Sequence, residues 1–305
     1  MPRVSVLLTC FNHLRYLPAC LESVRAQTYR DYEILALDDG STDGTRQWLE
    51  ENAKDAKLFF HDKNLGTYAS LNRGLSEATG ELIAILNDDD VWAPEKLERQ
   101  IALLEAHPEA GLAHTDGWFL DEKGERLEGS PLGFEFPRIE TGDVLLALLH
   151  ANKIIASAAL VRRECFARLG GFDEAYFGSG DWQMWLRIAE EWHVGFVPEP
   201  LTFYRAHPEG ASQKLERIWR DDERLREWIR ARYSVYQAKG YDPRALRAAM
   251  AHNEACLGTV KNLNGDPRGG RAAYARSIRL APGRLKSYLR WLATFLPREA
   301  FKRLK

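Results

Sequence analysis

Short, uniformly apolar runs alternate with amphipathic stretches along the first 107 residues of the chain. A strand that is covered on both faces is apolar throughout, whereas a surface helix is apolar along one face only. The apolar runs therefore predict buried strands at residues 4–9, 33–38, 57–61 and 82–86. The amphipathic stretches predict helices at residues 14–27, 45–52, 67–78 and 94–107. This alternation predicts an α/β fold with a doubly wound, mostly parallel sheet flanked by helices.

The pattern changes near residue 212, after which only helical periodicity remains. The predicted helices of this part are residues 215–238, 243–263, 267–280 and 285–295, with Gly240, Gly265 and Pro282 between them. Glycine and proline between periodic stretches are typical of helix ends. The sequence therefore predicts an α/β domain over residues 1–211 and a helical C-terminal region over residues 212–305.

Polar side chains follow three of the predicted strands where each strand ends. Thr9 ends the first strand, Asp38 and Asp39 end the second, and residues 87–90 follow the fourth. In a doubly wound sheet, ligands bind beyond the carboxyl ends of the strands. We therefore expect a ligand site at this edge of the sheet.

Three consecutive carboxylates, Asp88, Asp89 and Asp90, repel one another unless a cation lies between them. Mg²⁺ and Mn²⁺ bind carboxylate oxygens and often share them with substrate phosphates. The alternative is an acidic turn that caps a helix beginning at Pro94. One aspartate can cap the helix while its neighbours bind a metal, so both interpretations stay open on these residues alone.

Composition narrows the class of protein. A formal net charge of −2 and a charged fraction of 28% give no indication of nucleic-acid binding or of a disordered acidic tail. The four cysteines are scattered without a C-x-x-C pair, which disfavours structural zinc and favours a reducing, cytoplasmic compartment. The N-terminus lacks signal-peptide order, and polar residues interrupt the longest apolar region, so we expect no transmembrane helix.

The first strand is followed by neither G-x-G-x-x-G nor G-x-x-x-x-G-K-[ST], which disfavours dinucleotide-binding and P-loop sites. An aromatic residue at that place, Phe11, suits stacking on a nucleotide base. Asp39 suits a hydrogen bond from a ring N–H such as that of uracil or thymine. The alternatives are core packing for Phe11 and a turn bond from the Ser41 or Thr42 backbone for Asp39.

Several longer segments occur in a fixed order: residues 2–12 (PRVSVLLTCFN), 27–29 (QTY), 33–43 (EILALDDGSTD), 64–66 (NLG), 72–74 (NRG) and 87–97 (NDDDVWAPEKL). Together they resemble the nucleotide-binding half of family 2 inverting glycosyltransferases, which have the GT-A fold. The resemblance is dense over residues 2–105 and continues more sparsely to residue 207. It implies a nucleotide-sugar-binding half at residues 1–108 and an acceptor-binding half at residues 109–211.

The resemblance assigns the donor side residue by residue. The implied nucleotide-sugar contacts are Thr9, Phe11, Asn12, Asp39, Asn64, Gly66 and Asp88. The family's acidic motif begins with aspartate where this chain has Asn87, and Asp89 takes the metal-ligand position. Residues 204–207 (YRAH) resemble a late element whose histidine, here His207, completes the shell of Mn²⁺ or Mg²⁺. The alternative for His207 is an ordinary hydrogen-bonded histidine.

On the acceptor side, residues 177–187 (FGSGDWQMWLR) resemble the family motif in which a carboxylate before an aromatic helix is the general base. Asp181 takes that position, and the glutamate that usually precedes it is replaced by Gly180. The alternative is that Asp181 only caps the following helix. Trp185 is expected in the core, and Trp182 is the better candidate for an exposed ring.

The resemblance implies an inverting, metal-dependent hexosyltransferase that moves a sugar from a UDP- or dTDP-sugar to a hydroxyl acceptor. The acceptor would be a glycan, a lipid-linked molecule or another hydroxyl compound in polysaccharide, glycolipid or other cell-surface glycan synthesis. One alternative is a non-catalytic carbohydrate-binding or scaffold protein, which Asn87 and Gly180 favour. A sugar nucleotidyltransferase is disfavoured, because it needs a Gly- and Lys/Arg-rich triphosphate loop after the first strand.

The end of the chain is basic and apolar at once. Its basic residues are Arg284, Lys286, Arg290, Arg298, Lys302, Arg303 and Lys305, and they lie beside several leucines and aromatic residues. Such an amphipathic end predicts peripheral contact with an anionic membrane surface, at the inner face for a cytoplasmic protein. The alternative is an ordinary packed helix with a solvated basic face.

Overall fold

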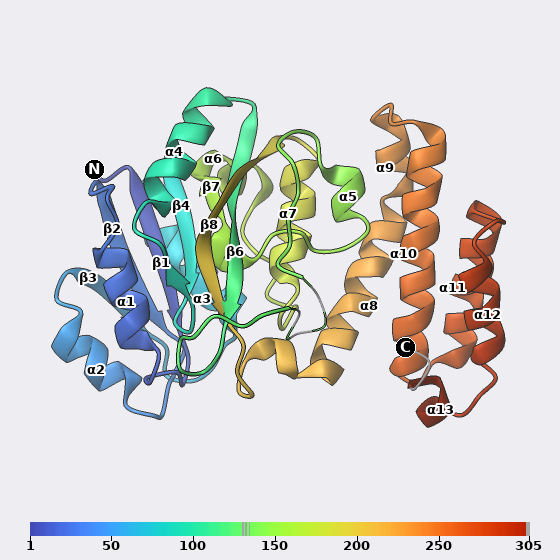
Figure 1. Cartoon of the computed structure of the whole chain (residues 1–305), viewed down its shortest axis with the longest axis horizontal. Coiled ribbons are helices and arrows are strands. Elements are labelled where there is room, and N and C mark those ends of the chain that lie inside the picture. Colours follow the sequence, from blue (N-terminus) through green and yellow to red (C-terminus); the bar gives the residue numbers. More distant parts are fainter. Residues whose placement is uncertain (130, 132, 134, 303–305) are drawn as a thin grey trace. The chain divides into compact units, whose positions relative to one another are not determined.

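The computed structural model describes residues 1–129, 131, 133 and 135–302 (Figure 1). By its internal contacts the chain forms two compact units, Met1–Val144 with Lys153–Gln213, and Leu145–Asn152 with Lys214–Lys305. The short inserted segment was not predicted to belong to the helical unit, because its packing partner is distant in the sequence. The functional subdivision at residues 108 and 211 stays a prediction.

The first unit contains a mixed eight-stranded sheet with the order β3-β2-β1-β4-β7-β6-β8-β5. The strands are β1 (Val4–Cys10), β2 (Tyr32–Asp38), β3 (Ala56–Phe60), β4 (Leu82–Asn87), β5 (Val91–Trp92), β6 (Ala110–Leu120), β7 (Leu160–Arg162) and β8 (His193–Arg205). The four predicted strands pair in parallel, and β6 pairs in parallel with β8. The antiparallel pairings all involve strands from the second half of this unit.

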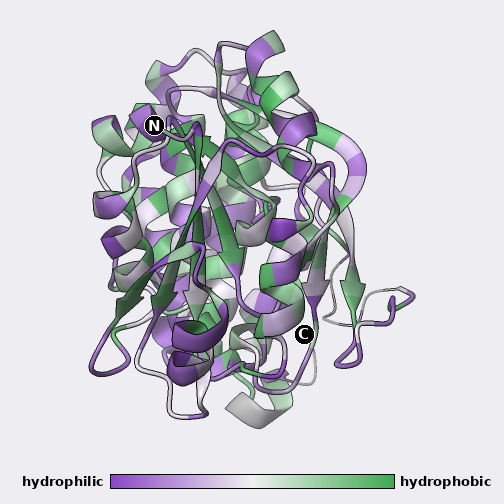
Figure 2. Ribbon diagram, turned by 90° about the vertical axis from the view of Figure 1, so that its left-hand side faces the viewer, coloured by the Kyte–Doolittle hydropathy of each residue, from purple (hydrophilic) through white to green (hydrophobic). Residues whose placement is uncertain are grey.

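Helices flank this sheet, as the alternating pattern predicts (Figure 1). They are α1 (Leu17–Arg25), α2 (Thr45–Asn52), α3 (Thr67–Glu77), α4 (Lys96–Ala106), α6 (Arg163–Leu169) and α7 (Gly180–Ala189), with short 3₁₀ turns at Ala156–Ala158 and Ala211–Gln213. The strands show mostly hydrophobic colours, whereas the helices carry both colours (Figure 2). All of β1 and the first five residues of β4 are buried, which confirms that these apolar runs are interior strands.

At the amino ends of the parallel strands, charged groups have protein partners. The Glu33 carboxylate accepts hydrogen bonds from Ser5 Oγ (2.6 Å) and from the Thr79 N–H (2.8 Å) and Oγ1 (2.7 Å). Lys57 Nζ lies 2.7 Å from its other oxygen. Burial would raise the pKa of Glu33, but these donors lower it to about 2.

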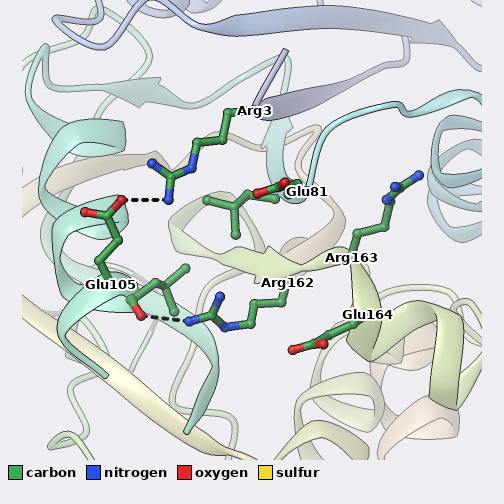
Figure 3. Close-up of a pocket in the computed structure, with 8 residues that line it drawn as sticks. Arg3, Glu81, Glu105, Arg162, Arg163 and Glu164 are labelled. Atoms are coloured by element: carbon green, nitrogen blue, oxygen red, sulfur yellow. Dashed lines mark hydrogen bonds and ion pairs between the residues drawn. The ribbon is translucent and has the colours of Figure 1, made fainter. Parts of the chain in front are cut away.

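A pocket at the same edge is lined by three arginines and three glutamates (Figure 3). Within it, Arg3 and Glu105 form an ion pair of 2.7 Å. Arg162 donates hydrogen bonds to the carbonyl oxygens of Ala110 (2.8 Å) and Leu104 (2.7 Å). The charges that line this pocket are therefore balanced.

The second unit is helical. It contains α5 (Leu145–Leu148), α8 (Leu215–Ala231), α9 (Tyr233–Ala238), α10 (Pro243–Leu263), α11 (Pro267–Leu280), α12 (Leu285–Ala293) and α13 (Arg298–Lys302). Asp242 and Asp266 cap α10 and α11, each accepting a backbone hydrogen bond of 2.8 Å ahead of a proline in the first turn. Among the described residues, no helix has both the length and the apolar character needed to cross a bilayer.

Candidate active site

Hydrogen bonds of Asn12 connect the loop after β1 to the loop after β2. Its backbone lies in the left-handed region (φ 56°), and its N–H donates to Ser41 Oγ at 3.0 Å. Its side-chain oxygen accepts a hydrogen bond from the Thr42 N–H at 2.8 Å. The neighbouring Phe11 is 39% exposed, so the alternative of core packing for this ring is wrong. The loop therefore presents an aromatic face at the carboxyl end of β1.

Asp39 joins the loop after β2 to the start of α3. Its carboxylate is buried and accepts hydrogen bonds from the N–H groups of Leu65 and Gly66, both at 2.8 Å. His61 Nδ1 lies 3.0 Å from the same carboxylate. An ionised carboxylate accepts about four hydrogen bonds, so Asp39 keeps capacity for one more partner.

The alternative of a local turn bond for Asp39 is wrong, because the Ser41 N–H donates to Asp38 Oδ1 instead, at 3.3 Å. Gly66, next to the exposed Asn64, has a φ of +99° that favours glycine. A Cβ at Gly40 would lie 2.6 Å from the Lys63 backbone, so the two loops touch here as well.

Asn87 keeps one function of the aspartate that it replaces. Thr9 Oγ1 donates a hydrogen bond to Asn87 Oδ1 at 3.0 Å. An aspartate at this position would accept the same hydrogen bond and would add one negative charge to the cluster. The substitution therefore preserves the contact between β1 and β4 and lowers the charge of the acidic cluster.

The three aspartates after β4 have different surroundings. Asp88 accepts a hydrogen bond from the Phe11 N–H at 2.9 Å. The buried Asp90 accepts hydrogen bonds from Ser157 Oγ and from the Arg205 N–H at 3.0 Å. Burial and the nearby charge of Asp89 raise the pKa of the Asp90 carboxyl well above its usual range. The capping alternative is wrong for all three, because α4 begins after Glu95 without a side-chain cap.

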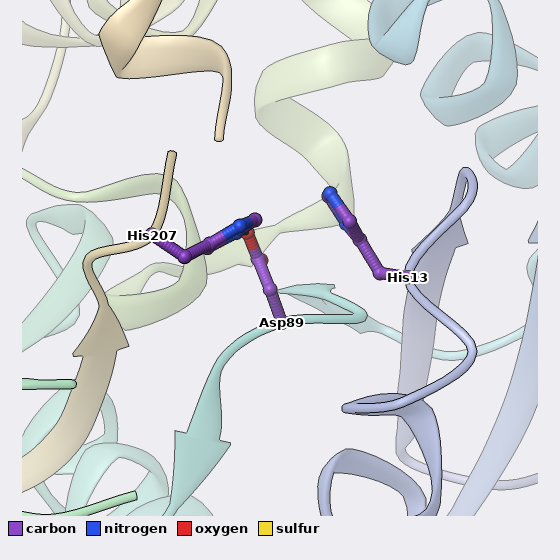
Figure 4. Close-up of side chains that lie close together, drawn as sticks. All are labelled: His13, Asp89 and His207. Carbon is purple, nitrogen blue, oxygen red and sulfur yellow. Dashed lines mark hydrogen bonds and ion pairs between the residues drawn. The ribbon is translucent and has the colours of Figure 1, made fainter. Parts of the chain in front are cut away.

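Asp89 lies in the one group of potential metal ligands found among the described residues (Figure 4). His13, Asp89 and His207 each offer a ligand atom, and these atoms lie within 4.8 Å of one another. His207 Nε2 is 3.0 Å from Asp89 Oδ2, and its Nδ1 is 3.2 Å from Glu209 Oε2. His13 Nδ1 is 2.8 Å from Asp88 Oδ1.

These residues fit a divalent cation. Metal-binding histidines commonly hold a carboxylate through their second ring nitrogen, as His13 holds Asp88 and His207 holds Glu209. Burial alone would lower the pKa of His13, but the hydrogen bond to Asp88 and the neighbouring negative charges raise it to about 9. A bound cation would take the place of that proton.

His13 was not predicted as a site residue. Its place beside His207 depends on the return of β8 to this edge of the sheet, and the two histidines have perpendicular rings with centroids 4.8 Å apart. The only sequence signal was its position two residues after Phe11, in the loop that follows β1.

Asp181 lies in the first turn of α7 and is buried. Ser179 is the residue before α7 and makes no side-chain cap bond, but Asp181 Oδ1 accepts a hydrogen bond from the Trp182 N–H at 2.7 Å, so Asp181 does bind the first turn of the helix as the capping alternative expects. The N–H groups of Gly180 and Asp181 both donate to Tyr68 Oη, at 2.8 Å and 3.1 Å. Trp182 is 7% exposed, which contradicts the expectation of an exposed ring, and the core position of Trp185 is confirmed.

Tyr68 explains the glycine before Asp181. A Cβ at Gly180 would lie 2.7 Å from Cε2 of the Tyr68 ring. The ring also stacks on Phe172, with centroids 5.7 Å apart. A glutamate at position 180 therefore requires Tyr68 to move.

Electrostatics link Asp181 to the acidic cluster. Burial is the main cause that raises the pKa of Tyr204, and the charges of Asp90, Asp89 and Asp181 raise it further. The carboxylates that follow β4 and the carboxylate of α7 thus both act on the pKa of one tyrosine.

A family model described as Glycosyl transferase family 2 matches residues 5–170. An uncharacterized glycosyltransferase of Rickettsia felis is 29% identical over 216 residues, which is 70% of this chain and 36% of that protein. The putative glycosyltransferase EpsE of Bacillus subtilis is 38% identical over 129 residues, 41% of this chain and 46% of EpsE. The chain thus spans between a third and a half of the length of these relatives.

Two solved structures have the same fold. S. aureus TarS 1-349 superposes with a TM-score of 0.63 at 16% identity, covering 92% of this chain and 81% of that one. The mannosyltransferase PcManGT from Pyrobaculum calidifontis, solved with GDP-Man and Mn²⁺, gives a TM-score of 0.59 at 23% identity and covers 96% and 79%. Both have GT-A type architecture, so the GT-A fold expected from the sequence is confirmed.

Proposed function

Because this chain belongs to glycosyl transferase family 2, we propose that it is an inverting, metal-dependent enzyme that moves a sugar from a UDP- or dTDP-sugar to an acceptor hydroxyl. The observation that carries the proposal is the potential metal trio of His13, Asp89 and His207. The buried carboxylate of Asp181 is a second functional group, and its charge and that of Asp89 both raise the pKa of Tyr204.

The nucleotide is held by the loops after β1, β2 and β3. The exposed Phe11 ring offers a face for a base, and Asp39 has capacity to accept a hydrogen bond from a ring N–H. Uracil and thymine present such an N–H. TarS 1-349 was solved with UDP-GlcNAc and PcManGT with GDP-Man, so a guanosine donor is the competitor to test.

His13, Asp89 and His207 would hold Mn²⁺ or Mg²⁺. A cation there supplies Lewis-acid stabilisation of the charge that develops on the leaving diphosphate. Asp88 fixes the His13 ring through Nδ1 and the Phe11 backbone through its other oxygen. Asp88 therefore orients a metal ligand and the base-stacking residue together.

Asp181 acts as the general base. It accepts the proton of the acceptor hydroxyl while that oxygen bonds to the anomeric carbon from the face opposite the diphosphate. The bond from carbon to the phosphate oxygen breaks with its electron pair on oxygen, and the configuration inverts. Proton acceptance by a positioned carboxylate contributes a factor of about 10² to 10⁴, and the first turn of a helix favours its negative charge.

Tyr68 positions this base. Its hydroxyl accepts the N–H groups of Gly180 and Asp181, and its ring fills the space in which the family's glutamate would lie. This arrangement supports Asp181 through the backbone of α7 without a second carboxylate. The absence of a side chain at Gly180 is then a feature of a working site.

The proposal places the enzyme in the cytoplasm, in synthesis of a polysaccharide, glycolipid or other cell-surface glycan, with a glycan or lipid-linked acceptor. Scattered thiols, which favour a reducing compartment, support the location. Peripheral contact of the basic C-terminal segment with a membrane belongs to the same prediction.

Donor hydrolysis tests the proposal without an identified acceptor. The full chain is incubated with UDP-, dTDP- and GDP-sugars and Mn²⁺, and release of the nucleoside diphosphate is measured with and without chelator. We expect release from a uridine or thymidine donor that the chelator abolishes. No release from any donor by folded, metal-loaded protein would favour the carbohydrate-binding scaffold, for which Asn87 and Gly180 are the supporting features.

A further inference from the structure

Helix α12 turns its polar side chains toward the rest of its unit. Ser287 and Thr294 are 0% and 2% exposed. Ser287 Oγ lies 2.9 Å from Ser277 Oγ on α11, and Arg290 donates to Thr259 Oγ1 on α10 at 3.2 Å. Hydrogen bonds between small polar groups therefore attach this helix to its neighbours.

The apolar side chains of α12 and of the turn after it point to solvent. The exposed fractions are Leu285 74%, Tyr288 40%, Leu289 67%, Leu292 58%, Phe295 64% and Leu296 46%. At about 100° per residue the positions within α12, Leu285, Tyr288, Leu289 and Leu292, share one face of that helix. They are six of the eleven exposed large hydrophobic side chains in the described part of the chain. A contiguous apolar patch of this kind marks an interaction surface, which an ordinary packed helix with a solvated basic face does not have.

The basic charge of the C-terminal segment indicates which partner binds the apolar face of α12. Residues 267–305 contain eleven lysines and arginines and one acidic residue, whereas residues 1–266 contain 31 basic and 43 acidic residues. The exposed Lys286 lies about a third of a turn from the centre of the apolar face. Arg303 and Lys305 add to this charge in the sequence and lie outside the described residues. A second copy of the chain would bring two equally basic segments together, which like-charge repulsion opposes.

We propose that α12 and the following turn lie flat on an anionic lipid bilayer. The face formed by Leu285, Leu289 and Leu292 enters the boundary between headgroups and acyl chains, and the basic side chains around it contact the anionic headgroups. Long lysine and arginine stems suit this geometry, since they keep the charge at the headgroups while their methylenes cover apolar surface. This inference does not depend on the proposed catalytic function.

Vesicle binding tests it. The full chain is sedimented with phosphatidylglycerol vesicles and with phosphatidylcholine vesicles, beside the double variant Leu289→Asp/Leu292→Asp. Both leucines are more than half exposed, so the variant keeps the fold, which thermal unfolding of the free protein checks. The matched control is Leu215→Asp/Val235→Asp, which adds the same charge at exposed sites on α8 and α9.

We expect binding to phosphatidylglycerol vesicles that is at least about tenfold stronger than binding to phosphatidylcholine vesicles. The double variant should bind at least about tenfold more weakly than the intact chain, and the control should bind as the intact chain does. Absence of binding to anionic vesicles would overturn the proposal, as would equal binding by the double variant. A dimer in solution that Leu289→Asp/Leu292→Asp converts to a monomer would assign the face to a second copy instead.

Discussion

The pKa values of buried carboxyl groups shift in opposite directions at the two ends of the same parallel strands. At the amino ends, several donors lower the pKa of Glu33 to about 2 against the effect of burial, and the arginines and glutamates of the nearby pocket balance (Figure 3). At the carboxyl ends, burial raises the pKa values of Asp38, Asp88 and Asp90. Hydrogen bonds outweigh burial for Glu33 at one end, whereas burial outweighs hydrogen bonds for Asp38, Asp88 and Asp90 at the other.

This difference separates stability from function. A fully partnered carboxylate such as Glu33 stabilises the folded state and leaves nothing for a ligand. Carboxylates that are buried beside one another repel, and a bound cation or substrate relieves that repulsion. The amino ends therefore hold the sheet together, and the carboxyl ends form the proposed donor site.

The largest expected effect is at the carboxyl end, at Asp181. Asp181→Asn keeps an oxygen that can accept the Trp182 N–H and removes the proton acceptor. We expect kcat for sugar transfer or donor hydrolysis to fall by about 10² to 10⁴, with unchanged affinity for the nucleoside diphosphate by calorimetry. Normal turnover in this variant would show that the base is another residue.

The next effect is at the amino end and concerns stability alone. Glu33 has a lowered pKa in the folded state, so its contribution is present above the unfolded pKa near 4.5 and is lost as pH falls toward 2. Glu33→Gln should lower the free energy of unfolding by about 2 kcal/mol at pH 7. Urea unfolding of both proteins at pH 7 and at pH 3 should show the difference shrinking at the lower pH. A difference that stays constant with pH would mean that Glu33 acts through packing.

A pair of tyrosines compares the two ends directly. Tyr68→Phe removes the acceptor for the α7 N–H groups, and Tyr32→Phe removes a hydrogen bond to the Val24 carbonyl at the amino end. We expect Tyr68→Phe to reduce kcat about tenfold with unchanged KM for the donor, and Tyr32→Phe to leave both constants unchanged. Equal kinetic effects of the two substitutions would show that Tyr68 has only a structural role.

The smallest effect is expected at the amino-end pocket. Arg3 and Glu105 are 35% and 56% exposed, and exposed ion pairs contribute little. Glu105→Gln should change the free energy of unfolding by about 0.5 kcal/mol or less and leave turnover unchanged. A marked loss of turnover would show that the amino ends of the strands also contribute to catalysis.

The elements that the sequence predicted best are those whose signals are local. The bounds of α10 and α11 agree with the prediction, because Asp-Pro pairs start both helices, and Gly265 follows α10 and Pro282 follows α11. The buried strands at Val4–Cys10 and Leu82–Asn87 needed only an apolar run. The start of α4 was placed two residues early, because Pro94 and Glu95 form a turn before the helix.

The sequence could not predict features that depend on distant contacts. His13 meets His207 only because β8 pairs beside β6 in the same sheet. Gly180 looked like a lost carboxylate until the ring of Tyr68, 112 residues away, was found in that space. The outward face of α12 was hidden as well, since the same amphipathic pattern fits a helix that packs its leucines inward.

The central claim is that the carboxyl-end aspartates and histidines form a metal-dependent nucleotide site. Thermal unfolding of the intact chain and of Asp89→Ala, with UDP or dTDP and with Mn²⁺, Mg²⁺ or chelator, tests it most directly. We expect either nucleotide to raise the Tm of the intact chain only when metal is present, by several degrees at saturation, and to leave the Tm of Asp89→Ala unchanged. No shift with any nucleotide, or an equal shift in the presence of chelator, would contradict the claim.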